Sequence, residues 1–280
     1  MNNRLKRVTQ IMLVALALGG VMQLGTALAS AGMFKFGEEP AVALAATSAA
    51  ETSQLSDNLS APASNESPAI TSYAQWLDAF HVHETLQQEL SEWMADGHKR
   101  SDMMIGFTFL YHQYGMMSEL LPMVEAREAG ASWAELFSDY VDEHGAFEPR
   151  AFDMNELESL TSSSSLSADD IMIADRISFV SGESVKELLA LKLETNKAWQ
   201  DIATERSIVN GSSELPRVQI TEKQFALYSD ESFSEDRVAQ GFVLANKLGT
   251  APEAVIASMK EGHSETEILA EALEAQYESY

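Results

Sequence analysis

Apolar residues recur every three or four positions from Ser72 onward, and polar residues fill the positions between them. This spacing places the apolar side chains along one face of an α-helix. The first helical stretch predicted in this way runs from Trp76 to Met94, and Gly97 ends it. Apart from the short segment 218–220, no stretch alternates apolar and polar residues as a half-buried strand does. We therefore expect an all-α fold.

The helical pattern occurs three times at a nearly fixed spacing. Evenly spaced glycines are predicted to end the first helix of each copy, at Gly115, Gly182 and Gly249. Stops with almost the same spacing follow the second helix, at Gly130, Asn196 and Gly262. Glycine and asparagine suit these positions because they tolerate the left-handed conformation that ends a helix. An aspartate opens the first helix of each copy, where it favours the positive end of the helix dipole, at Asp102, Asp169 and Asp236.

The predicted helix starts are consistent with these helix ends. Pairs with capping-box spacing precede several of the predicted helices: Ser132 with Glu135, Ser184 with Glu187, Thr250 with Glu253 and Ser264 with Glu267. Trp133 and Trp199 stand at matching positions of the third helix, each followed three residues later by an aliphatic residue, so we expect both in the core. The copies span about 86–145, 153–208 and 221–278. A fixed period of about 67 positions predicts three tandem units, stacked as a solenoid or as a compact bundle.

Two features modify this plan. The segment from Met103 to Tyr111 is apolar on every side. Such a helix is buried on all faces, or it marks a partner interface if nothing in the chain covers it. The serine run 162–165 and the segment from Asn210 to Ser213 have linker composition, so we expect them to connect the units.

The middle copy carries a resemblance. Its runs SGESVKELLALK and AWQDIATE are similar to a helical-hairpin repeat of exported bacterial proteins, with the form SG-S-EELLALK followed by SW-EIA. The resemblance extends over roughly residues 101–274 and is weakest in the first copy, where Pro122 falls inside the second helix. It implies a fold and no activity, so it assigns no functional residue.

The N-terminal part of the chain, up to position 71, differs from the rest. Residues 1–31 combine a basic start at Arg4, Lys6 and Arg7 with an apolar stretch and small residues typical of a cleavage site. This predicts an export signal, with an uncleaved membrane anchor as the alternative. Residues 32–71 are rich in Ala, Ser and Pro and predict a disordered spacer. The domain of helical repeats then covers 72–280, and we expect a periplasmic or other envelope location in a bacterium.

Charge and composition narrow the possible functions. The formal net charge is −25, and nearly all of it lies from Ser72 onward. Nucleic acids and anionic membrane surfaces attract basic proteins, so we expect neither as a partner; contact with a membrane is expected only through an uncleaved N-terminal segment. The chain has no cysteine, which excludes disulfides, thiolate metal sites and a cysteine nucleophile.

Candidate chemistry is sparse. Histidine and methionine cluster in the first copy, and imidazole and thioether groups bind copper; the candidate ligands are His81, His83, His112, Met116 and Met117. Their spacing does not form a standard metal motif, because His81 and His83 do not share a helical face. Asp142, Glu143 and Glu148 lie near His144, but no hydrolase, zinc-protease or phosphate-loop motif is present, and no cofactor is expected.

These observations favour a non-enzymatic role. Repeat proteins without a catalytic motif commonly present a binding surface, so we expect an exported module that binds or organises a protein partner. A periplasmic metal-handling protein that uses the His and Met residues is the first alternative. An enzyme whose site forms only in three dimensions is the second. The oligomeric state is left open.

Overall fold

The computed structural model describes residues 72–153, 158 and 165–280. The predicted signal and spacer, and most of the serine run 162–165, lie outside these residues. The described part of the chain forms twelve α-helices and no strand, which confirms the all-α prediction. No helix in that part is both long and apolar enough to cross a membrane.

The helices follow one another with short connections. Their bounds are α3 (Tyr73–Ala79), α4 (Glu84–Ala95), α5 (Arg100–Gln113), α6 (Met117–Glu128), α7 (Trp133–His144), α9 (Ala168–Ser181), α10 (Val185–Thr195), α11 (Trp199–Thr204), α12 (Glu222–Tyr228), α13 (Glu235–Leu248), α14 (Pro252–Glu261) and α15 (Glu265–Tyr277). Three successive helices thus recur as α5–α6–α7, α9–α10–α11 and α13–α14–α15. That these are three copies of one unit stays a prediction.

Helix α5 is the centre of the larger core. Every residue from Asp102 to Leu110 is buried, as the apolar segment predicted. Trp76 of α3 covers one side: its ring meets Phe107 edge-on, and its indole N–H donates to Thr108 Oγ1 at 3.2 Å. Helices α6 and α15 cover other sides. The helix is therefore buried within the chain, so it offers no partner interface.

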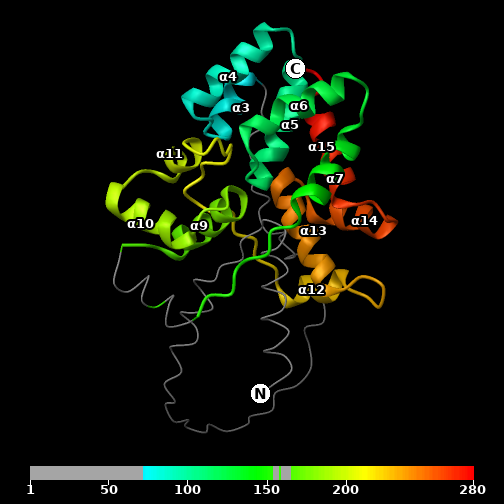
Figure 1. Ribbon diagram of the computed structural model, residues 1–280. Coiled ribbons are helices and arrows are strands. Elements are labelled where there is room, and N and C mark those ends of the chain that lie inside the picture. Colours follow the sequence, from blue (N-terminus) through cyan, green and yellow to red (C-terminus); the bar gives the residue numbers. More distant parts are fainter. Residues whose placement is uncertain (1–71, 154–157, 159–164) are drawn as a thin grey trace, which may run out of the picture.

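The packing order differs from the sequence order. Helix α15 of the third unit packs on α5 and α7 of the first unit, and their side chains form one apolar cluster. The second unit has an apolar cluster of its own, formed by α9, α10 and α11 with Tyr114 of the first unit. Figure 1 shows these three helices gathered apart from α6, α7 and α15. The chain is thus not a solenoid in which each unit packs only on its sequence neighbours.

Most helix ends lie where the sequence placed them. Gly130, Asn196, Gly182, Gly249 and Gly262 all have positive φ, as predicted. Gly115 is the exception: Tyr114 takes the left-handed position at the end of α5, with φ 62°. Gly115 is needed instead for close packing, because an added Cβ would lie 2.6 Å from Leu110 Cδ2 and 2.7 Å from the Tyr140 hydroxyl.

The helix starts agree in part with the predicted caps. The capping boxes Ser132–Glu135 and Ser264–Glu267 form, and Asp102, Asp169 and Asp236 lie in first turns. Ser184 precedes α10, but its side chain accepts no capping hydrogen bond. The residue that precedes α14 is Ala251 and not the predicted Thr250, because Pro252 takes the first helical position.

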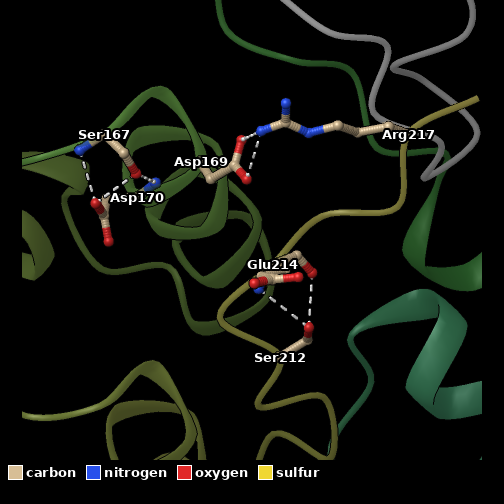
Figure 2. Close-up of polar contacts among 6 residues, drawn as sticks. All are labelled: Ser167, Asp169, Asp170, Ser212, Glu214 and Arg217. Atoms are coloured by element: carbon tan, nitrogen blue, oxygen red, sulfur yellow. Dashed lines mark hydrogen bonds and ion pairs between the residues drawn. The ribbon is translucent and has the colours of Figure 1, made fainter. Parts of the chain in front are cut away.

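The start of α9 carries a capping box that sequence reading missed. Ser167 Oγ accepts from the Asp170 N–H at 3.1 Å, and the Ser167 N–H donates to Asp170 Oδ2 at 2.7 Å. In Figure 2, Arg217 from the segment after α11 reaches back to Asp169, with Nη2 3.2 Å from Oδ2. The same segment turns at Ser212, whose hydroxyl donates to the Glu214 carbonyl. These contacts attach the returning chain to the second unit.

The predicted linker at Asn210–Ser213 is packed rather than free. Asn210 is 7% exposed, and its amide donates to the Tyr111 carbonyl at 2.8 Å. The Val209 N–H donates to the Gly115 carbonyl at 3.0 Å, next to an isolated bridge between Met116 and Ile208. The segment connects α11 to α12, as expected of a linker, and it also joins the two apolar clusters because the asparagine side chain bonds to a backbone carbonyl of the first unit.

Candidate functional site

A pocket of about 180 Å³ lies where the second unit meets the first. One wall comes from the end of α5, from α6 and α7, and from the loop after α7; the other comes from α9. Its lining residues are Gln113, Met116, Glu119, Tyr140, His144, Gly145, Phe147, Arg176, Phe179 and Val180. The site thus combines side chains from segments that lie far apart in the sequence.

The first wall is organised by the carboxylate of Glu119. Its Oε2 accepts from the Met116 N–H at 2.7 Å and from the Tyr140 hydroxyl at 3.1 Å. Its Oε1 lies 2.8 Å from His144 Nε2. The pKa of Tyr140 is raised, first by burial and then by the negative charge of Glu119. Oε2 therefore already has two donors, and Oε1 faces the His144 ring.

His144 completes this arrangement. Its Nδ1 lies 3.0 Å from the Tyr140 carbonyl, and its ring stacks on the Tyr140 ring at 4.1 Å. A carbonyl only accepts, so Nδ1 is the nitrogen placed to donate to it, and Nε2 faces the Glu119 carboxylate. The cluster of Glu119, Tyr140 and His144 thus holds α6 and α7 together.

The second wall carries a buried cation. Arg176 is 4% exposed, and its guanidinium carbon lies 3.8 Å from the centre of the Phe147 ring. Its Nη2 is buried and has no hydrogen-bond partner among the described residues. The adjacent Asp175 is engaged by Arg150, with its backbone N–H at 2.9 Å and Nε at 3.1 Å. Burial lowers the pKa of Arg176 to about 10, against opposing effects of Tyr114 and Asp175.

Two further basic groups lie behind this wall. Burial lowers the pKa of Lys247 to about 8, with the charge of Arg176 acting in the same direction and Glu265 opposing both. Burial and the charge of Lys247 lower the pKa of His112 to about 3. His112 is therefore neutral at ordinary pH, and Lys247 lies near both the guanidinium of Arg176 and the carboxylate of Glu265.

This environment predicts a pH effect from His112. In the unfolded chain the imidazole binds a proton below its ordinary pKa of 6.5, whereas in the folded chain it stays neutral until about pH 3. Unfolding then takes up a proton between these values, so stability is lost as the pH falls from 6.5 toward 3. We expect His112→Gln to reduce the stability lost between pH 7 and 4.5 by roughly 1–2 kcal/mol. Urea unfolding at the two pH values checks this, and equal losses in both proteins would contradict it.

The first two predicted metal ligands, His81 and His83, lie in the connection between α3 and α4. His81 lies in an exposed turn, where its carbonyl accepts from Gln200. His83 caps α4, with Nδ1 accepting from the Thr85 N–H, and its Nε2 lies 3.9 Å from Asp201 Oδ1.

The other three candidates serve packing. His112 contacts the rings of Phe80 and Tyr111, Met117 is buried in the larger core, and Met116 lines the pocket. Nowhere in residues 72–153 and 165–280 do three His, Cys, Asp or Glu side chains come together to hold a metal ion.

The two tryptophans are core residues, as expected. Trp133 and Trp199 are each 1% exposed at the first position of α7 and α11. The Trp199 indole N–H donates to Asp170 Oδ1 at 2.7 Å.

Of the residues that line the pocket, sequence reading singled out only Met116 and His144, and it did not place them together. It placed Asp142, Glu143 and Glu148 near His144, whereas the fold pairs His144 with Glu119 of the preceding helix. One signal was present: Arg176 is the only basic residue within a stretch that is otherwise apolar on most sides, IMIADRISF. A basic residue at such a position needs a partner or a function.

Comparison with known proteins adds no relative. No protein-family model, no curated protein and no solved structure matches the chain. The likeness to exported bacterial repeat proteins therefore remains an expectation, and the functional argument rests on the geometry of the pocket.

Proposed function

We propose that this protein is an exported, non-enzymatic binding module, and that the pocket between α5–α7 and α9 receives a small ligand or one group of a protein partner. The observation that carries the proposal is Arg176, a buried residue of the pocket lining whose guanidinium has no ion-pair partner among the described residues. Such groups are rare in folded proteins, since an unpaired buried charge is costly.

The rest of the lining supports binding over catalysis. Phe147 and Phe179 meet edge-on at 5.5 Å, and Phe179 is 43% exposed at the pocket. Aromatic walls with a few placed polar groups are typical of ligand pockets. The opposite wall places the His144 imidazole beside the Glu119 carboxylate, but no serine, threonine or cysteine that could act as a nucleophile is among the lining residues. A volume of about 180 Å³ admits one side chain or a small molecule.

The test is a binding screen read by the backbone amides of the pocket. We expect at least one of benzoate, benzylamine and benzyl alcohol to shift the amide signals of Gly145, Phe147 and Phe179. Val180→Trp and Gln113→Trp, which fill the pocket from opposite walls, should each abolish these shifts while the circular dichroism spectrum stays helical. The proposal fails if no compound moves these signals, or if the shifts persist in both filled variants.

A further inference from the structure

We infer that the pocket recognises a carboxylate attached to a small apolar body, and that Arg176 is the residue that binds it. This inference rests on the proposed binding role of the pocket and specifies the chemistry of its ligand. The carboxylate of the ligand is then the anionic partner that Arg176 lacks among the described residues.

Arg176 is unpaired in a chain rich in carboxylates. The chain has 43 Asp and Glu residues against 18 Lys and Arg. Four other arginines each form a salt bridge: Arg127, Arg150, Arg206 and Arg217. Arg100 and Arg237 form none among the described residues, but Arg100 is exposed and Arg237 is half-buried. Arg176 is thus the only buried arginine of the described residues, and no described carboxylate pairs with it.

The charges around the pocket favour an anion at Arg176. The neighbouring Asp175 is engaged by two donors of Arg150. Across the pocket, Glu119 Oε2 accepts from the Met116 N–H and the Tyr140 hydroxyl, and Oε1 faces the His144 ring. Lys247 is close enough to Arg176 for the two charges to repel. A cation at Arg176 would therefore meet a positive group that has no ion-pair partner among the described residues.

Among anions, a carboxylate fits the shape of the guanidinium and its surroundings. A guanidinium is planar and matches a carboxylate with two parallel N–H donors. The ring of Phe147 lies over the guanidinium and restricts its position. Phe147, Phe179 and Val180 supply an apolar wall beside it, and the volume suits an acid of about ten non-hydrogen atoms. A free acid and the terminal carboxylate of a peptide share this chemistry.

The experiment compares benzoate with benzamide, which has nearly the same shape and no charge. A short peptide ending in Phe is added, with its C-terminus free or amidated. Isothermal titration with the full chain measures each dissociation constant. We expect at least one free acid to bind about tenfold more tightly than its amide, and Arg176→Met to remove that preference. Arg176→Lys should retain part of it, because the charge remains and the planar fork is lost.

The matched control is Arg217→Met, which removes an arginine whose partner Asp169 lies on the same helix as Arg176. It should leave every dissociation constant unchanged. Binding of benzoate alone identifies a small free acid, and binding of the free peptide alone identifies a chain terminus. Equal binding of acid and amide would overturn the carboxylate inference while the pocket remains a binding site. No binding by either acid would overturn the inference, and the proposed function is then decided separately by the amine and alcohol of the screen.

Discussion

Replacing Arg176 by methionine is expected to stabilise the free protein by about 1–4 kcal/mol. Methionine has a similar length and no charge, and its thioether packs well against aromatic rings such as Phe147. The wild-type protein keeps a guanidinium at 4% exposure with no salt bridge among the described residues, and the favourable contact with Phe147 offsets only part of this cost. Urea unfolding without any ligand, at neutral pH, measures the change.

Arg206→Met is the matched control for this prediction. Arg206 lies in the same unit and donates to both carboxylate oxygens of Glu183, at 2.6 and 2.8 Å, and to the Ile202 carbonyl at 2.8 Å. Its removal is expected to cost about 1–3 kcal/mol, since these charged hydrogen bonds are lost. If Arg176→Met raises the free energy of unfolding and Arg206→Met lowers it, Arg176 is an unpaired arginine kept for function and Arg206 is a paired arginine kept for stability. Destabilisation by Arg176→Met similar to that of Arg206→Met would show that Arg176 is structural.

Trp199→Ala is expected to lower the free energy of unfolding by about 3–5 kcal/mol. The indole is 1% exposed in the smaller apolar cluster and bonds to Asp170 at 2.7 Å. Alanine leaves a cavity and also removes the donor of a carboxylate that belongs to the capping box of α9. The smaller cluster has fewer buried side chains to close around such a cavity than the larger one.

Leu227→Ala provides the control, since Leu227 on α12 is 70% exposed. It should change stability by no more than about 0.5 kcal/mol. Denaturation monitored by circular dichroism gives both values under the same conditions. A decrease in the free energy of unfolding below about 1 kcal/mol for Trp199→Ala would contradict the assignment of Trp199 to the core of the second unit.

Local features of the fold were readable from the sequence because they depend on nearby residues. Asn196 and Gly262 take the left-handed positions that their conformational freedom predicted, and Ser132 and Ser264 cap the helices that follow them. Trp133 and Trp199 are buried because each continues an apolar helical face.

Features that depend on distant contacts were not readable. The packing of α15 on α5 joins segments from opposite ends of the described chain, and helical periodicity does not specify which faces meet. Gly115 was assigned a conformational role, yet it is a glycine because Leu110 and Tyr140 approach it closely. Asn210 was assigned to a linker, yet its side chain reaches Tyr111, 99 positions away.

The candidate site also depends on contacts between residues that are distant in the sequence. Glu119, His144 and Arg176 come from three helices and share no motif. Only the position of Arg176 within an apolar stretch pointed to it, and the sequence does not tell whether a carboxylate of the chain reaches that arginine. The histidine and methionine cluster was the more visible pattern in the sequence, and a metal site formed by its side chains stays a prediction.

The most direct test of the central claim is the Nε–Hε signal of Arg176 in a ¹H–¹⁵N spectrum, assigned by its absence in Arg176→Lys and followed during titration with benzoate. The account predicts a downfield proton shift that saturates with benzoate, is absent with benzamide, and is accompanied by shifts at Gly145 and Phe179. An Arg176 signal that stays unchanged while benzoate and the free peptide are added to saturation would contradict it.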